Sequence, residues 1–256
     1  MPRQLADRHA LITGGGSGIG AAIAVALSAA GASVSLVGRR AAPLKEVSHN
    51  LDRACTIVAD VTSEEDMGAM VQAAREAHGP IDILVANAGA AESVPVSKLG
   101  LKHWRRMLDV NLTGAFLTVR AALPDLIRQD AGAGRIVFIA STAGLKGYPY
   151  VAAYCAAKHG VVGLARALAA ELAATRVTVN AVCPGYTETP LLEGSLANIA
   201  AKTGRSRGEA QAVLRQLNPQ GRFVKPDEVA GAVLWLCSPA SQAITGQAIS
   251  VSGGEV

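Results

Sequence analysis

The chain has 256 residues, long enough for one domain with a complete hydrophobic core, and 50% of them are hydrophobic while only 4% are aromatic. Its net charge of +4 is mild and no run of lysine and arginine occurs, so nucleic acid is not an expected partner, although a small positive excess suits an anionic ligand. The four cysteines are far apart and lack both the spacing of metal ligands and the density of a disulfide scaffold, so we expect no metal site and reduced thiols in a cytoplasmic protein.

Residues 11–38 carry no charged side chain and could therefore imitate a membrane span. Five glycines between Gly14 and Gly20 interrupt this stretch, and Gly31 interrupts it again. A strand, a turn, a short buried helix and a second strand explain the pattern better, so we expect no membrane segment.

The first strand is predicted at residues 9–13, followed by a glycine-rich turn and an alanine-rich helix that runs to about Ala30. Strand, glycine turn and helix are the context of a dinucleotide-binding fingerprint. Glycines let the backbone approach a pyrophosphate, and the helix N-terminus offers free N–H groups. The alternative is a packing turn without a ligand. The residues of this turn that we expect to bind the cofactor are Gly14, Ser17, Gly18, Ile19 and Gly20.

The second predicted strand, residues 33–37, ends at Gly38, Arg39 and Arg40. An NAD site expects a carboxylate here for the ribose 2′-hydroxyl, and residues 32–45 contain none. Two arginines could instead pair with a 2′-phosphate, so NADP(H) is the preferred cofactor. If both arginines are merely solvated, selectivity is loose and NAD(H) is possible.

Strands continue to alternate with helices along the chain. Further strands are predicted near residues 55–59, 81–86, 135–140, 177–182 and 248–251, and helices near residues 63–78, 101–129 and 151–174. This alternation predicts an α/β protein: a doubly wound parallel sheet with helices on both faces. Ligands of such sheets bind at the carboxyl ends of the strands, where the candidate residues gather.

Tyr154 and Lys158 lie four residues apart in the helix predicted at residues 151–174, and so share one helix face. An ammonium beside a phenol lowers the pKa of the phenol, which suits proton transfer. Ser141, at the end of the fifth predicted strand, could hydrogen-bond a substrate oxygen. The alternative is an ordinary helix with an exposed tyrosine and lysine.

Residues 186–222 follow the sixth predicted strand, where a substrate lid would sit. Lysines and arginines make this segment basic, which could attract an acidic substrate or an acyl carrier, or could simply mark a solvated helical face. The helix at residues 151–174 is apolar on more than one side, so we expect it to pack against a partner subunit.

Over nearly its whole length the chain resembles the classical short-chain dehydrogenases/reductases. The motifs that carry the resemblance are residues 13–20, Asp60 with Val61, Asn87-Ala88-Gly89, Asn111, Ser141, Tyr154 with Lys158, and Pro184-Gly185 followed by Thr187 and Thr189. The resemblance implies a Rossmann fold with strand order 3-2-1-4-5-6-7 and a homotetramer. Ala86 stands where many members have a second asparagine.

The resemblance also implies roles for individual residues. Tyr154 would donate a proton to a carbonyl oxygen or take one from an alcohol, and Ser141 would bind that oxygen. Lys158 would lower the Tyr154 pKa and hold the nicotinamide ribose, and Asn111 would interrupt its helix and hold a proton-relaying water. The cofactor contacts beyond the glycine turn would be Asp60, Val61, Asn87, Ala88, Gly89, Tyr154, Lys158, Pro184, Gly185, Thr187 and Thr189.

The sequence thus predicts one domain over residues 1–256 with a lid at about 186–222. The resemblance is strongest to polyketide-type ketoreductases and hydroxyacyl-thioester dehydrogenases. It implies an oxidoreductase that transfers a hydride between NADP(H) and a ketone or secondary alcohol, with an acyl thioester as one possible substrate. The alternatives are an NAD-dependent alcohol or 3-hydroxyacyl-CoA dehydrogenase and, from another class, a non-catalytic cofactor-sensing protein.

Overall fold

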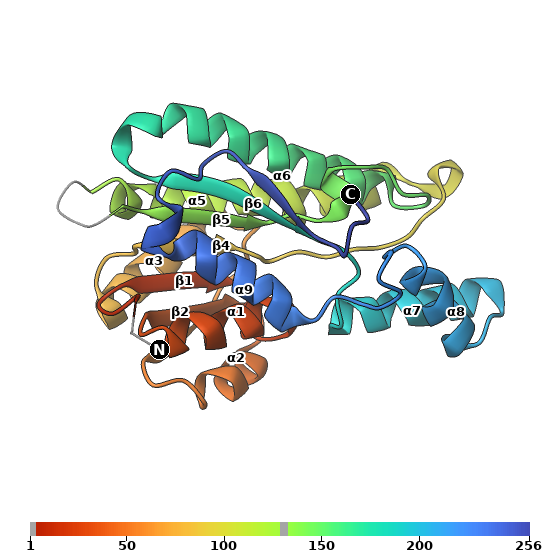
Figure 1. Ribbon diagram of the computed structural model, residues 1–256, viewed down its shortest axis with the longest axis horizontal. Coiled ribbons are helices and arrows are strands. Elements are labelled where there is room, and N and C mark those ends of the chain that lie inside the picture. Colours follow the sequence, from red (N-terminus) through yellow and green to blue (C-terminus); the bar gives the residue numbers. More distant parts are fainter. Residues whose placement is uncertain (1–3, 129–132) are drawn as a thin grey trace.

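The computed structural model describes residues 4–128 and 133–256. Within them, seven parallel strands form one sheet in the order β3-β2-β1-β4-β5-β6-β7, with helices on both faces (Figure 1). This confirms the predicted fold. The strands are β1 (His9–Thr13), β2 (Ser33–Gly38), β3 (Ala54–Val58), β4 (Ile83–Ala86), β5 (Arg135–Ile139), β6 (Thr178–Pro184) and β7 (Ala248–Val251).

Most helices flank the sheet in two layers, whereas α7 and α8 form a pair beside it (Figure 1). They are α1 (Gly18–Ala29), α2 (Ala41–Ser48), α3 (Glu64–His78), α4 (Leu101–Leu108), α5 (Gly114–Leu126), α6 (Ala152–Glu171), α7 (Pro190–Thr203), α8 (Arg207–Arg215) and α9 (Pro226–Cys237). Short 3-10 turns are η1 (Val96–Lys98), η3 (Thr142–Gly144), η4 (Ala173–Thr175) and η5 (Pro239–Ser241). No helix in the described part of the chain is long and apolar enough to cross a membrane.

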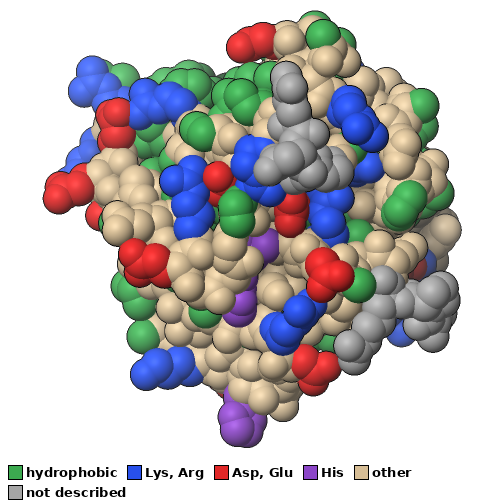
Figure 2. Space-filling model, turned by 90° about the vertical axis from the view of Figure 1, so that its left-hand side faces the viewer, with side chains coloured by type: hydrophobic (Ala, Val, Ile, Leu, Met, Phe, Trp, Pro, Cys, Tyr) green, Lys and Arg blue, Asp and Glu red, His purple; other side chains and the backbone are tan. Residues whose placement is uncertain are grey.

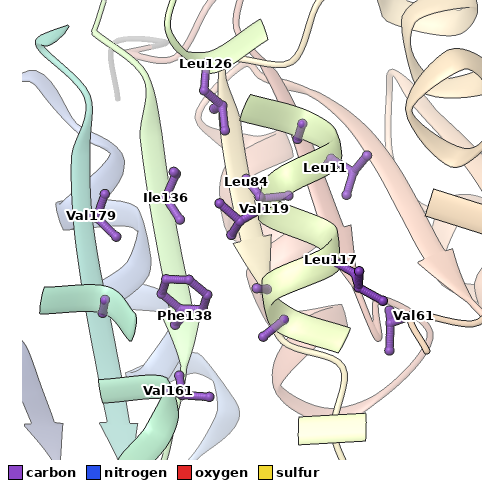
Figure 3. Packing of buried hydrophobic residues seen from close by; sticks show 14 of the residues in the cluster. Leu11, Val61, Leu84, Leu117, Val119, Leu126, Ile136, Phe138, Val161 and Val179 are labelled. Carbon is purple, nitrogen blue, oxygen red and sulfur yellow. The ribbon is translucent and has the colours of Figure 1, made fainter. Parts of the chain in front are cut away.

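Alternating side chains of the strands build two separate hydrophobic cores. Leu11, Leu84 and Phe138 point to the face covered by α3, α5 and α6 (Figure 3). Ile12 and Val85, their neighbours in sequence, point to the face covered by α1 and α9. Because both faces are covered, the central strands β1, β4, β5 and β6 are buried at every position and mostly apolar, as is typical of parallel sheets.

The helix predicted at residues 101–129 is interrupted in the structure. It divides into α4, a π-helical turn η2 (Asp109–Thr113) and α5, which ends at Leu126; the predicted end at Gln129 lies outside the described residues. The interruption falls on Asn111, as the resemblance implied. Its buried side chain donates to Met107 O of the preceding turn, and such bulges often occur at functional sites.

Two other boundaries near the site differ slightly from the prediction. β5 ends at Ile139, and Ser141 caps the turn η3 by accepting a hydrogen bond from Ala143 N. α6 ends at Glu171 and is followed by a 3-10 turn. Ser63 caps α3, since its Oγ accepts a hydrogen bond from Asp66 N.

The segment at residues 186–222 forms the helical pair α7 and α8, which stands at the right-hand side of Figure 1. It has a small core of its own, made by Leu192, Leu196, Ala210, Leu214 and Phe223. Figure 2 turns the opposite side of the molecule to the viewer. On the part of that side drawn as described residues, lysines and arginines are interspersed with acidic side chains.

Candidate active site

A cleft of about 320 Å³ lies at the carboxyl ends of β1, β4, β5 and β6. The four predicted catalytic residues Asn111, Ser141, Tyr154 and Lys158 all line it. The predicted cofactor residues that also line it are Gly14, Ser17, Gly18, Ile19, Gly20, Asn87, Ala88, Gly89, Pro184, Gly185, Thr187 and Thr189. The structure therefore brings together segments separated by more than a hundred residues, as the topology predicts.

The glycine turn at the start of α1 fits a pyrophosphate. A Cβ at Gly14 would lie 2.8 Å from Asn87 Nδ2, and one at Gly20 would lie 2.2 Å from Gly14 O, so neither position admits a side chain. Ser17 makes no side-chain cap, and the first turn of α1 carries no acidic residue. The helix N–H groups and the positive end of the helix dipole are thus left to an anion.

Thr13 and Asn87 tie the end of β1 to the end of β4. Asn87 Nδ2 donates to Thr13 O at 2.8 Å and to Gly14 O at 3.2 Å, and Thr13 Oγ1 accepts from Asn87 N and Ala88 N. The side-chain N–H groups of Asn87 therefore hold the glycine turn. The hydroxyl of Thr13 has a positioning role that sequence reasoning did not assign.

The other four predicted cofactor residues lie beyond the cleft, where β2 and β3 end. Arg39 and Arg40 are exposed. The Asp60 carboxylate accepts from Thr62 N and Thr62 Oγ1, and these bonds lower its pKa. The Val61 side chain packs in the core (Figure 3), so only its main chain can face a ligand.

Tyr154 and Ser141 both line the cleft, and the Ser141 hydroxyl is close enough to the phenol to lower its pKa. Burial raises the pKa of Tyr154 to about 12, and the bond from Ser141 offsets only part of that increase. The spacing of the two residues led us to expect a lowered pKa, whereas the pKa of Tyr154 is raised overall. The desolvation of the phenolate outweighs any attraction by the ammonium.

Lys158 is nearly inaccessible to solvent, with 4% of its surface exposed. Its Nζ donates to Ile139 O at 2.8 Å and lies 5.7 Å from the centroid of the Tyr154 ring. Burial lowers the pKa of Lys158 to about 8. The spacing in the sequence correctly placed the two side chains together, but the ammonium faces the ring and the end of β5.

Asn111 joins the π-helical turn to the loop after β4. Its Nδ2 donates to Ala90 O and Met107 O, each at 2.9 Å, and its Oδ1 accepts from Ala90 N. These bonds use both N–H groups of the side-chain amide. A relay water would therefore be held by the second lone pair of Oδ1 or by the main chain of the turn.

Thr187 and Thr189 shape the approach to α7. Thr187 Oγ1 donates to Gly185 O at 2.9 Å, and Thr189 Oγ1 caps α7 by accepting from Leu192 N. A Cβ on Gly18 would lie 3.0 Å from the Thr189 side chain, which places α7 directly against the glycine turn.

The remaining wall of the cleft is mostly apolar or aromatic. Tyr148 and Tyr186 meet edge to face, with ring centroids 6.4 Å apart. Part of this wall comes from the lid predicted at residues 186–222. Nothing in the sequence singled out Glu255, which contacts Tyr148. The other residues of this wall are Ala90, Ala91, Ser93, Val151, Leu191, Leu192, Ser195, Ile199 and Leu214.

Comparison with known proteins agrees with this geometry. The family model described as short chain dehydrogenase matches residues 8–200. A Streptomyces coelicolor protein that carries the provisional name ketoacyl reductase is 40% identical over 249 residues, covering 96% of this chain and 95% of its own. The cis-4-hydroxycyclohexanecarboxylate dehydrogenase of Sinomonas cyclohexanicum is 38% identical over 259 residues, covering 99% of this chain and 98% of its own.

Among solved structures, a variant of the actinorhodin polyketide ketoreductase with NADPH is 38% identical and superposes with a TM-score of 0.92. The match covers 100% of this chain and 99% of that one. Family model, relatives and solved structure all span the glycine turn and the Ser141, Tyr154 and Lys158 cluster. The chain therefore belongs to the short-chain dehydrogenase family, whose members oxidise alcohols or reduce carbonyl groups with a nicotinamide cofactor.

Proposed function

We propose that the protein is an NADP(H)-dependent ketoreductase. The observation that carries the proposal is the convergence, in one cleft, of an uncapped glycine turn with the hydroxyls of Ser141 and Tyr154. The relatives named as ketoacyl or polyketide ketoreductases support the same reaction.

In this reaction a bound NADPH supplies the hydride that forms the new C–H bond at the carbonyl carbon. Tyr154 donates its proton to the carbonyl oxygen as the C=O π bond breaks, and Ser141 holds the same oxygen by a hydrogen bond. Because its pKa is near 12, Tyr154 is protonated at neutral pH, which is the form that reduction needs. Lys158 stabilises the phenolate that is left.

The apolar wall of the cleft favours a ketone with an apolar body. The lid contributes four leucine and isoleucine side chains to the cleft that Tyr148 also lines: Leu191, Leu192, Ile199 and Leu214. A groove between residues 91–94 and α7 continues outward from this wall and would leave room for the remainder of a longer substrate, such as an acyl thioester. Burial of the ketone against these side chains would supply most of the binding energy.

The lid role of residues 186–222 is part of the same proposal. Lys202 Nζ of α7 donates to Ser93 O at 2.8 Å, so the helical pair is tied to the loop on the other side of the groove. Opening this bond would widen access to the cleft. We propose that the lid is part of a single domain that spans residues 1–256 and is not a separate domain.

NADP(H) is proposed over NAD(H) because Arg39 and Arg40 follow β2 and no carboxylate stands there. Arg39→Ala should raise the KM for NADPH about tenfold or more and leave the KM for NADH nearly unchanged, since one charge-assisted contact to a 2′-phosphate is lost. Steady-state kinetics with each cofactor measures this. Arg53→Ala, just before the amino end of β3, is the control. An equal loss with both cofactors would contradict the assignment.

A second candidate is an NAD-dependent alcohol dehydrogenase working in the oxidative direction. The Sinomonas relative, named a dehydrogenase, favours it. The same cleft would serve, with Tyr154 accepting the alcohol proton. A cofactor sensor without catalysis is the third possibility, and it is opposed by the complete set of Asn111, Ser141, Tyr154 and Lys158 in one cleft.

A panel of ketones and secondary alcohols, assayed with each nicotinamide cofactor by absorbance, separates the three. The proposal expects NADPH oxidation with apolar ketones. Tyr154→Phe should lower kcat by about 10²- to 10⁴-fold while leaving NADPH affinity within about twofold, because only the proton donor is removed. Binding of NADPH without turnover on any ketone would favour the sensor, and unchanged turnover by the variant would refute the role of Tyr154.

We also propose a homotetramer located in the cytoplasm. Four free cysteines suit a reducing compartment. Apolar side chains exposed on α5 and on α9, on opposite faces of the sheet, would provide two different interfaces.

A further inference from the structure

Glu255 is a buried carboxylate at the substrate side of the cleft. The chain turns back after β7 at Gly253 and Gly254, whose φ angles are +66° and +92°. This turn brings the Glu255 side chain, only 1% exposed, against the loop after β5 and the end of β6. A carboxylate is almost never this deeply buried unless it is paired.

One of its partners, Tyr148, lines the cleft, and the other, Lys146, lies two residues before it in the same loop. Glu255 Oε1 lies 2.5 Å from the Tyr148 hydroxyl and 3.1 Å from Lys146 Nζ. Lys146 Nζ also donates to the main-chain oxygen of Glu255 and lies 5.1 Å from the centroid of the Tyr148 ring. Glu255 Oε2 would be 3.1 Å from a Cβ on Gly185, so the carboxylate also packs on the strand end beside the predicted cofactor site.

The phenol of Tyr148 is fully occupied by this arrangement. Its oxygen lies 2.7 Å from Thr142 Oγ1 as well as next to Glu255. A phenol has a single O–H, and Tyr148 donates it in a hydrogen bond to the Glu255 carboxylate. The Thr142 hydroxyl must therefore donate its own proton to the phenol oxygen. Burial and the bond to Glu255 raise the pKa of Tyr148, in keeping with a phenol that stays protonated.

The ring of Tyr148 is therefore held at both ends. Its hydroxyl is bonded to Glu255 and Thr142, the neighbour of Ser141, and its edge meets Tyr186. Tyr148, Tyr186 and Tyr154 line the same cleft. With its hydroxyl bonded to Thr142 and Glu255, Tyr148 presents a fixed aromatic surface to the cleft that Tyr154 also lines.

We propose that Glu255 is a positioning residue that fixes Tyr148 as a wall of the cleft and thereby sets which ketones are oriented for reaction. This inference rests on the proposed ketoreductase function. A ketone large enough to touch the Tyr148 ring is held in one orientation. A small ketone does not reach the ring, so its binding does not depend on the position of Tyr148.

The test compares Glu255→Gln, Tyr148→Phe and the double variant with the unaltered protein. For a bulky aryl ketone, Glu255→Gln should raise KM about tenfold with kcat changed by less than about threefold, because a hydrogen bond to a charged group is weakened. A small aliphatic ketone should show neither change. The two single effects should not add in the double variant, because both remove the same contact.

Two controls separate positioning from folding. Asp125→Asn also breaks a buried ion pair, with Arg75, but lies away from the cleft. It should lower thermal stability without altering the preference between the two ketones. Lys146→Met removes the ion pair but leaves the phenol bonded, and should give an intermediate effect.

Amide hydrogen exchange of residues 142–150 tests, without a substrate, whether Glu255 fixes the loop that carries Tyr148. Faster exchange in Glu255→Gln than in Asp125→Asn would support it, even if no ketone is turned over and the proposed function fails. Exchange equal to that of the unaltered protein, or an equal loss of activity on both ketones, would overturn the inference.

Discussion

Tyr154 and Lys158 show why a correct pairing of residues does not predict their chemistry. Spacing along a helix placed the two side chains on one face, and the structure agrees. The pKa of each group depends on atoms from other elements, chiefly the end of β5 and the loop after β6, which spacing cannot describe. Burial raises the pKa of Tyr154 and lowers that of Lys158, so it disfavours the charged form of both.

The buried ammonium of Lys158 should cost stability that an apolar side chain of similar shape does not. Its pKa falls from 10.5 to about 8, equivalent to about 3 kcal/mol against the charged form. Lys158→Met should therefore be more stable than the unaltered protein by about 1–3 kcal/mol at pH 7, a rise in Tm of several degrees. Thermal unfolding without cofactor measures this, while turnover should be lost.

The advantage of the methionine variant should shrink as pH rises. Between pH 8 and 10.5 the unfolded state of the unaltered protein binds more protons at this lysine than the folded state, so its stability gains with pH. The variant lacks this gain. A difference in Tm that stays constant from pH 7 to pH 10 would show that Lys158 is not buried in its charged form.

Strands and helices differ in how well the sequence predicts them. Most strand boundaries agree within two residues, because runs of buried apolar residues end abruptly at glycine or polar residues. The interrupted helix around Asn111 could be placed only by resemblance, since its cause is a bond to Met107 and to the loop after β4. The two helices α7 and α8 of the proposed lid have a core of their own, and their placement depends on contacts such as Lys202 with Ser93.

Glu255 is a residue near the site that no short sequence motif could have predicted. Each predicted catalytic residue belongs to a short motif at the end of a strand or in a helix turn. Glu255 has no such context: it lies after β7 and acquires its partners, Tyr148 and Lys146, only because β6 and β7 are adjacent in the sheet. The role of such a residue can be recognised only when the order of the strands in the sheet is known.

In the doubly wound architecture, helices on the two faces of the sheet expose apolar side chains to solvent in the monomer. Phe116 on α5 is 41% exposed, and Trp235 on α9 is 44% exposed. Figure 1 shows these helices on opposite sides of the sheet. The predicted contact of α6 with a partner subunit stays a prediction, and it concerns the same side of the sheet as α5.

A closed tetramer with dihedral symmetry needs two different self-complementary interfaces, which these two surfaces would supply. Phe116→Glu and Trp235→Glu should each reduce the proposed tetramer of 26.1 kDa protomers to a dimer, because a charge is placed in an apolar contact. The double variant should be monomeric. Size-exclusion chromatography with light scattering gives the masses, and Val58→Glu, 60% exposed on the edge strand β3, should leave the mass unchanged. If either single variant already yields monomers, one surface alone holds the assembly together, and the two-interface arrangement is wrong.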